Sequence, residues 1–318
     1  MDYWRRIVPM STSSGPNLSR SARNKGGGSK VLPILLAVIL LAGGAWALKT
    51  FFLDGGTPKN ILLMGVDQDK TRTDVVLLAH VDPRQGIVNL LSLPRDTYVN
   101  IPCGEIEVCY SPDKLAHAHA YGGEQGPQLA VKTVESFLGI QIDGYARVDY
   151  DGFKKVIDTL GGVEILIDKD MDYEDPTPPG LSIHFRASKT PQPLSGQKAL
   201  EYVRFRNDGQ GDIGRTERTR KFLHALIDSL KKNGKIGQLP QLWKDMAPYL
   251  TTNIDSGTAA ALARVAPKID TNAITMEMVP GKSVILKSGP WVWEADAAKT
   301  QVLVDTLIKN PKKPEEKK

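Results

Sequence analysis

Hydrophobic residues along this chain fall into two patterns, short continuous runs and longer stretches with helical spacing. Three continuous runs cover residues 60–66, 74–81 and 87–93, and runs of this length suit strands that are buried on both faces. From Pro127 to Leu138 the apolar residues instead recur at helical spacing. The same criteria predict strands at 145–149, 163–167 and 274–279, and helices at 153–160, 195–203, 213–232, 239–249, 256–266 and 295–308.

Strands that alternate with helices along a chain are typical of α/β proteins. We therefore predict a layered α-β-α fold, in which helices flank a central mixed sheet, over residues 57–309. The segment 310–318 is rich in charge and is expected to be a disordered tail.

A further apolar segment precedes this predicted domain. Residues 31–48 carry no charge, and ten of the eighteen are Val, Ile or Leu, a composition and length that suit a transmembrane helix. The basic segment 1–30 comes first, so we expect it to be cytoplasmic and disordered, with a single-pass anchor at 31–53 and the domain outside the cell membrane. A cleavable signal peptide is the alternative, because Ala45-Trp46-Ala47 resembles a cleavage site.

The charge of the chain is concentrated at its ends. The net charge is +5, of which residues 1–30 contribute +5 and residues 312–318 contribute +2, so the remainder carries −2. This balance argues against a general nucleic-acid-binding surface. The connector 54–58 spans at most ~17 Å, so the domain should lie close to the membrane, where a lipid substrate would be found.

The chain has two cysteines, Cys103 and Cys109. Outside the membrane they could form a disulfide, and closing a ring of this size would contribute about 2.4 kcal/mol in the loop-entropy model. Two unrelated thiols are the alternative. A zinc site is not indicated, because no second Cys or His pair has zinc-ligand spacing.

Charged residues stand where the predicted strands end. Asp67 follows the first strand, Arg72 and Asp74 flank the start of the second, and Arg95-Asp96 follows the third. Ligand crevices in α/β sheets lie outside strand ends. Aspartates beside arginines would suit a divalent cation, Mg²⁺ or Mn²⁺, that bridges a pyrophosphate. The alternatives are capping or turn roles for the aspartates and a surface ion pair for Arg95-Asp96.

A cluster of arginines lies later in the chain. Five arginines fall within residues 204–221. Arg204 and Arg206 would point the same way from an extended strand, whereas Arg215 and Arg218 would share one face of a helix. Guanidinium groups bind phosphate oxygens in pairs, so the cluster would suit a polyanion held from two sides. The alternative is a solvated, salt-bridged surface.

Several segments in order resemble the LytR–CpsA–Psr family. The resemblance covers roughly residues 57–309, and the order, the spacing and the preceding apolar segment all fit. The segments are NILLMGVD (60–67), TRTDVVLL (71–78), LSLPRDTYVNIP (91–102), DKLAHAHAYGG (113–123), DTLGGVEI (158–165), LSGQKALEYVRFR (194–206), GDIGRTERTRKFL (211–223), ITMEMVPG (274–281) and WVWEAD (291–296).

This resemblance implies an enzyme, a Mg²⁺-dependent phosphotransferase that moves a glycopolymer, such as a teichoic acid or a capsule, from a polyprenyl-pyrophosphate carrier to peptidoglycan. It implies metal binding by Asp67 and Asp74. It also implies contacts between the pyrophosphate and a set of basic residues. That set comprises Arg72, Arg95, Lys114, Arg204, Arg206, Arg215 and Arg218.

Asp96 and Asp212 are the candidates for a general base, and Asp212 matches the family's acidic residue before the helical arginines. Two positions depart from the family's usual pattern. Ala116 stands where an Asn or hydroxyl residue is usual, and Thr219 where a Gln is usual. Both departures could weaken a polar contact to the head group.

Two other functions compete with this interpretation. A hydrolase could cleave polyprenyl pyrophosphates with the same residues and water as the acceptor. A membrane-bound regulator without enzymatic activity belongs to a different class. The basic segment 1–30 is too short for a DNA-binding fold, and the main domain is expected on the other side of the membrane.

Overall fold

The computed structural model describes residues 57–67, 69–174, 182–205, 211–233, 239–255, 257–258, 274–287 and 289–311, except the side chains of 211–217, 220, 230, 231, 239, 240 and 242. The chain divides into two units, 1–46 and 47–318, and all described residues belong to the second. The predicted cytoplasmic segment 1–30 and anchor 31–53, most of the predicted helix 256–266 and nearly all of the predicted tail lie outside the described residues. Within the described part, no helix is long and apolar enough to cross a membrane.

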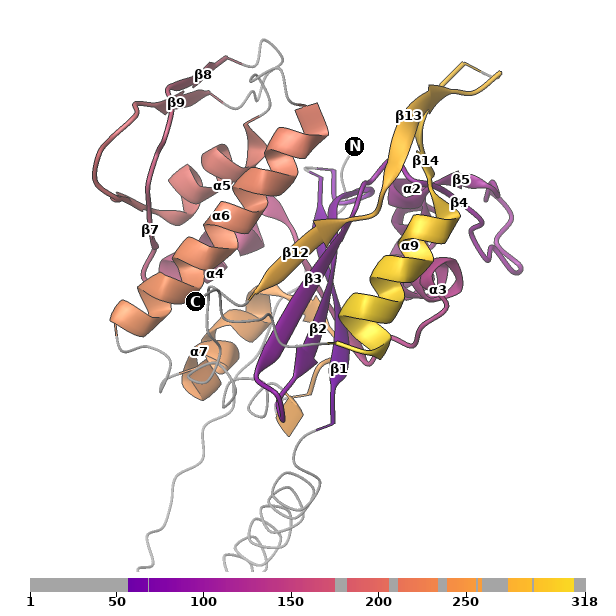
Figure 1. Ribbon diagram of the computed structural model, residues 1–318, viewed down its shortest axis with the longest axis horizontal. Coiled ribbons are helices and arrows are strands. Elements are labelled where there is room, and N and C mark those ends of the chain that lie inside the picture. Colours follow the sequence, from indigo (N-terminus) through magenta and orange to yellow (C-terminus); the bar gives the residue numbers. More distant parts are fainter. Residues whose placement is uncertain are drawn as a thin grey trace, which may run out of the picture. The chain divides into compact units, whose positions relative to one another are not determined.

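A six-stranded mixed sheet forms the centre of the second unit (Figure 1). Neighbouring β1, β2 and β3 are antiparallel, whereas β6 runs parallel to β1 and β12 runs parallel to β3. The predicted mixed sheet is therefore confirmed. In spatial order its strands are β11 (Thr251–Thr252), β6 (Gly144–Val148), β1 (Lys59–Val66), β2 (Thr73–Asp82), β3 (Ile87–Leu93) and β12 (Thr275–Met278).

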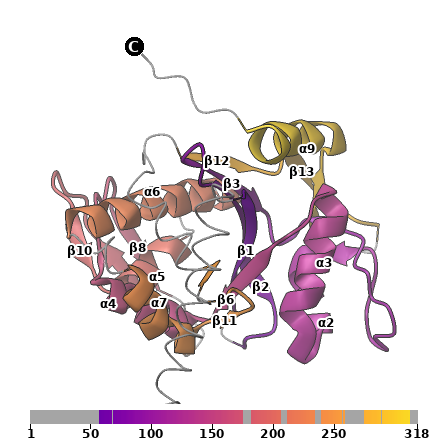
Figure 2. The same ribbon diagram turned by 90° about the horizontal axis from the view of Figure 1, so that it is seen from below.

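Helices cover both faces of this sheet, as predicted for a layered fold (Figure 2). One face carries α2 (Leu115–Tyr121), α3 (Gly126–Leu138) and α9 (Ala297–Val304); the other carries α4 (Tyr150–Leu160), α5 (Gly196–Arg204), α6 (Gly211–Lys232) and α7 (Leu239–Met246). Successive strand residues point to opposite faces. Leu78 accordingly packs with Val134 on the α3 side, whereas Leu77 packs with Leu223 on the α6 side. The continuous apolar runs in the sequence follow from this burial on two sides.

Smaller elements surround the central sheet. The predicted strand 163–167 forms β7 (Val163–Ile165), but it pairs with β10 (Gln192–Leu194) in a separate sheet. Two more pairs are β4 (Tyr98–Val99) with β5 (Asp113–Lys114), and β8 (Met171–Tyr173) with β9 (Ile183–Phe185). Short 3-10 turns occupy Gly123–Gln125 and Ala247–Tyr249.

The C-terminal part differs most from the prediction. The hairpin of β13 (Gly281–Ile285) and β14 (Trp291–Ala295) was not predicted. The predicted helix 295–308 starts later, at Ala297, because the carboxylate of Asp296 caps it by accepting a hydrogen bond from the Lys299 amide at 3.0 Å. The helix then ends in a π-turn at Asp305–Lys309.

A disulfide closes the loop between β4 and β5. The sulfur atoms of Cys103 and Cys109 lie 2.02 Å apart. Both side chains pack against the core on the α3 side of the sheet. The disulfide therefore belongs to the layer formed by α2, α3 and α9.

Candidate active site

One edge of the central sheet gathers the charged residues that the sequence placed at strand ends. The end of β1 lies beside the start of β2, because Val66 pairs with Thr73 across the hairpin. The end of β3 also lies beside the start of β2, and β6 ends next to β1. Residues that follow β1, β3 and β6 therefore meet the first residues of β2. We call this the catalytic edge and define it by Asp67, Asp74, Arg95, Asp96 and Tyr150.

Asp67 organises the loop between β1 and β2. Asp67 as a whole residue is 9% exposed, and its carboxylate accepts hydrogen bonds from the Thr71 amide at 3.0 Å and from the Arg72 side chain at 3.1 Å. From α2, the ring of His119 donates to the carbonyl of Thr71 at 2.7 Å. Burial lowers the pKa of His119, so the ring is a neutral donor near pH 7. The loop between β1 and β2 is thus held in place both by hydrogen bonds to Asp67 and by the hydrogen bond from His119.

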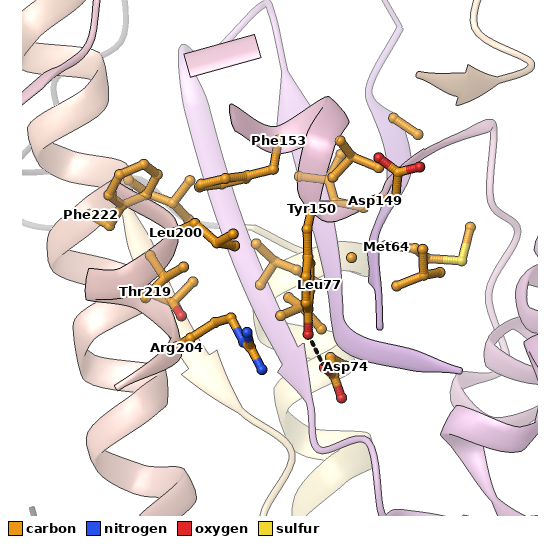
Figure 3. A pocket seen from close by; sticks show the side chains of 18 of the residues that line it. Met64, Asp74, Leu77, Asp149, Tyr150, Phe153, Leu200, Arg204, Thr219 and Phe222 are labelled. Carbon is orange, nitrogen blue, oxygen red and sulfur yellow. Dashed lines mark hydrogen bonds between the residues drawn. The ribbon is translucent and has the colours of Figure 1, made fainter. Parts of the chain in front are cut away.

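Asp74 bonds to two other residues of the catalytic edge, Arg95 and Tyr150, and Figure 3 shows its bond to Tyr150. Its Oδ1 accepts a hydrogen bond from Arg95 at 2.5 Å, and its Oδ2 accepts one from the Tyr150 hydroxyl at 2.9 Å. The guanidinium of Arg204 lies over the Tyr150 ring, 4.5 Å from its centroid. Burial and the charge of Asp74 raise the pKa of Tyr150 to about 12, so its hydroxyl stays protonated and donates.

Asp96 joins two basic residues at the same edge. Its carboxylate lies 3.6 Å from Arg95 Nε and 2.8 Å from Lys114 Nζ. Lys114 reaches this position because β5 pairs with β4 and sets Lys114 opposite Tyr98. The backbone of Asp96 is held by the amide of Trp293, which donates to its carbonyl at 2.8 Å. The hairpin of β13 and β14 therefore supports the edge, a role that the sequence did not suggest.

A pocket of about 680 Å³ opens beside the catalytic edge. It lies between strands β1, β2 and β6 and helices α4, α5 and α6 (Figure 3). Asp74, Arg95 and Arg204 line its polar end. Most of the remaining lining is apolar, and it includes Leu63, Val75, Leu77, Val148, Phe153, Leu200 and Phe222. One continuous cavity thus combines an apolar body with a charged end.

The predicted arginine cluster is only partly described. Arg204, at the end of α5, lines the pocket together with Asp74 and Arg95. Arg218 is only 4% exposed and donates to the carbonyl of Phe205, whose ring it also covers at 5.4 Å. Arg218 therefore links α6 to Phe205, the residue that follows α5. Arg206 and the side chains of Asp212 and Arg215 lie outside the described residues, so their roles stay predictions.

The candidate ligands for a divalent cation are the carboxylate oxygens of Asp67 and Asp74. No group of three or more His, Cys, Asp or Glu that could hold a metal occurs in the described part of the chain. Mg²⁺ usually takes one or two protein carboxylates and completes its shell with substrate phosphates and water. Asp67 and Asp74 fit that requirement in number and chemistry. Each is now neutralised by an arginine, Arg72 or Arg95.

The sequence analysis missed Tyr150 and Asp149. They follow β6 at the catalytic edge, where Asp149 pairs with Lys70 at 2.7 Å. The criterion that selected Asp67, a polar residue immediately after a predicted strand, applies equally to Tyr150, whereas Asp149 was placed inside the predicted strand 145–149 and in the structure follows β6. What the sequence lacked was the pairing of β6 with β1, which brings the two strand ends together.

Comparisons with known proteins point to one family. The model of the LytR_cpsA_psr family matches residues 48–309. Polyisoprenyl-teichoic acid–peptidoglycan teichoic acid transferase TagV from Bacillus subtilis is 32% identical over 262 residues, which are 79% of this chain and 64% of TagV. The chain thus matches slightly less than two thirds of that relative's length.

Solved structures show the same fold. The crystal structure of B. subtilis TagV superposes with a TM-score of 0.65 at 29% identity and covers 78% of this chain and 96% of that one. A structure of TagT bound to LI-WTA gives a TM-score of 0.61 at 26% identity and covers 78% and 88% of the two chains.

Proposed function

This chain belongs to the LytR_cpsA_psr family, and from that premise we propose that it is a membrane-anchored phosphotransferase. It moves a phosphate-linked glycopolymer from a polyprenyl-pyrophosphate carrier to peptidoglycan. The relatives named for the same transfer of teichoic acid support the reaction class. The apolar segment 31–48 supports an anchor at 31–53, with the N-terminus in the cytoplasm and the domain outside.

The pocket is the observation that carries this proposal. A polyprenyl pyrophosphate has an apolar tail and an anionic head, and the cavity of about 680 Å³ has an apolar body with a charged end. Ligand pockets of this size bury most of a bound molecule. Asp67, Asp74 and Asp96 are paired with Arg72, Arg95 and Lys114, and Asp149 is paired with Lys70. Arg204 adds a further positive charge at the polar end of the pocket, where it lies over the Tyr150 ring.

The arginines bind phosphate oxygens and stabilise the charge that develops during transfer. In the proposed step, an acceptor hydroxyl oxygen attacks the phosphorus linked to the glycopolymer. A new P–O bond forms, the bond to the bridging oxygen breaks, and the lipid monophosphate leaves with the electron pair. Asp96 takes the proton of the acceptor hydroxyl, and Asp212 is the second candidate for this role. Arg206, Arg215 and Arg218 complete the predicted phosphate-binding set.

Asp67 and Asp74 are the residues that would hold Mg²⁺, or Mn²⁺ in its place. When bound, the cation neutralises phosphate charge and polarises the phosphoryl oxygens. The two carboxylates are now paired with Arg72 and Arg95. Cation binding would therefore make both guanidinium groups available to phosphate.

Transfer and hydrolysis are separated by the fate of the polymer. Full-length protein in detergent would receive a radiolabelled glycopolymer on a polyprenyl pyrophosphate, with purified peptidoglycan as the acceptor. We expect label to become attached to peptidoglycan as lipid monophosphate is released. Free polymer alone would identify a hydrolase, and an unconsumed substrate would favour a regulator without enzymatic activity.

A further inference from the structure

Tyr150 stands where the apolar pocket meets the catalytic edge (Figure 3). It is the first residue of α4, directly after Asp149, which caps that helix by accepting a hydrogen bond from the Gly152 amide at 2.8 Å. The cap fixes the start of the helix and therefore the position of the Tyr150 backbone. The ring forms part of the pocket wall.

The hydroxyl of Tyr150 acts on Asp74. It donates to Oδ2 at 2.9 Å, while Oδ1 of the same carboxylate is bound to Arg95. Each carboxylate oxygen has a second lone pair, so a cation can bind Asp74 while the phenol still donates. An ordinary tyrosine has a pKa of about 10, so the phenol is a hydrogen-bond donor at physiological pH.

The ring of Tyr150 acts on a different group. The Arg204 guanidinium lies 4.5 Å from the ring centroid, within the range of a cation–π interaction. Arg204 leaves the end of α5, and Figure 3 shows its side chain directed toward Tyr150 and Asp74. The ring thus holds the guanidinium at the polar end of the pocket.

We propose that Tyr150 is a positioning residue with two separable tasks. Its hydroxyl orients Asp74 for the divalent cation, and its ring orients Arg204 for the phosphate of the ligand. This inference rests on the proposed function, because it assigns Asp74 to the cation and Arg204 to the head group. It adds a residue that connects the two and lies at the boundary with the lipid tail.

Two substitutions at this position separate the tasks. Tyr150→Phe removes the hydroxyl and keeps the ring, whereas Tyr150→Leu removes both. Losing a hydrogen bond that orients a metal ligand typically lowers metal affinity by roughly tenfold to a hundredfold. Tyr150→Phe should therefore weaken cation binding and leave metal-free phosphate binding unchanged. Tyr150→Leu should weaken both.

The control is Tyr145→Phe. Tyr145 lies in β6, five residues before Tyr150, and packs in the core on the α3 side of the sheet. Its hydroxyl accepts a hydrogen bond from Gln128 at 3.3 Å and does not line the pocket. This variant loses the same atom at a site that is remote from Asp74, and it should match wild type in both measurements.

The experiment uses full-length protein in detergent and two probes. Mn²⁺ binding is followed by electron paramagnetic resonance with saturating inorganic pyrophosphate, and pyrophosphate binding is measured by calorimetry in EDTA. Melting temperatures establish that each variant is folded. We expect a tenfold to hundredfold loss of Mn²⁺ affinity in Tyr150→Phe with unchanged pyrophosphate affinity in EDTA.

Equal Mn²⁺ affinity in Tyr150→Phe and wild type would overturn the inference, and so would an equal loss of both affinities in that variant. If wild type does not bind Mn²⁺, the inference and the cation assignment are both wrong. Failure of the transfer reaction with normal Mn²⁺ and pyrophosphate binding would contradict the proposed function alone.

Discussion

On one face of the central sheet, α2, α3 and α9 pack directly onto the strands; on the other, α4, α5 and α6 leave a pocket of about 680 Å³. We call these the closed face and the pocket face. Both faces are apolar, and side chains of the same strands form both. In β2, Leu78 on the closed face is fully buried, while Val75 on the pocket face is 39% exposed. Val75 belongs to the apolar lining of the pocket, and an apolar pocket of this size is the kind of surface that a ligand covers.

The catalytic edge joins the two faces, and a substitution within it should have the largest effect on activity. Asp74→Ala removes the partner of Arg95 and Tyr150 and the proposed cation ligand. We expect it to abolish Mg²⁺-dependent transfer while the domain stays folded. The peptidoglycan transfer assay checks the first point and circular dichroism the second, while calorimetry with Mg²⁺ and a polyprenyl pyrophosphate measures cation binding.

Asp151→Ala is the matched control, because Asp151 is an exposed residue of the same region that pairs with Lys154. The assignment of Asp74 would be wrong if Asp74→Ala bound Mg²⁺ as tightly as wild type under these conditions.

Truncation of one strand residue on each face tests the comparison itself. Leu78→Ala creates a cavity in a closed core and should lower the free energy of unfolding by about 2–5 kcal/mol. Val75→Ala removes atoms that border a pocket, so the cost should be about 0.5 kcal/mol or less. Urea unfolding of both variants gives the two values. Equal losses would show that the pocket face is packed like the closed face.

Loss of the disulfide should lower the stability of the protein through the closed face and leave ligand binding on the pocket face unchanged. Replacing Cys103 and Cys109 by serine opens the loop and should cost about 2.4 kcal/mol in the loop-entropy model. Because both residues pack on the α3 side, affinity for a polyprenyl pyrophosphate should not change. Urea unfolding and calorimetry of the double variant measure the two effects. A large loss of lipid affinity would indicate that the closed face controls the pocket.

Substitutions of two arginines of the predicted cluster, Arg204 and Arg218, should have different effects. Arg204 lines the pocket, and Arg204→Ala should reduce lipid pyrophosphate affinity by roughly tenfold to a hundredfold, with poor rescue by lysine. Arg218 is buried against Phe205, so Arg218→Ala should also lower the melting temperature. Calorimetry and thermal unfolding separate these outcomes. A silent Arg204→Lys would contradict bidentate phosphate binding.

The smallest effect concerns pH and the link between α2 and the catalytic edge. Burial lowers the pKa of His119 below its ordinary value, so the unfolded chain takes up a proton before the folded chain does. Stability should therefore decrease as the pH falls below about 6.5, the ordinary histidine value. In His119→Gln this decrease should be smaller, as urea unfolding at pH 7.5 and 5.5 would show. An unchanged pH dependence would contradict this role for His119.

Local pattern was enough to predict the main strands and the mixed sheet. The runs 60–66, 74–81 and 87–93 agree with β1, β2 and β3 to within one residue at each end. Family membership, predicted from the order of motifs, is confirmed by the match over 48–309. The meeting of Asp67, Asp74 and Arg95 followed from their places at strand ends.

The difference between the two faces could not be predicted from the sequence, because it depends on how far the helices on each face lie from the sheet in the folded protein. Leu77 and Leu78 are adjacent and chemically identical, and the sequence does not show which helices stand away from the sheet. The burial of Arg218 depends on the carbonyl of Phe205, a backbone group that carries no sequence signal. The position of Tyr150 depends on the parallel pairing of β6 with β1.

A crystal structure with a polyprenyl pyrophosphate and Mg²⁺ would test the central claim most directly. We predict electron density for the prenyl chain in the pocket between β1, β2, β6 and helices α4 to α6. The pyrophosphate should lie at Asp74, Arg95 and Arg204, with the cation on Asp67 and Asp74. A lipid bound on the closed face, or a pyrophosphate remote from Asp74 and Arg204, would contradict the account.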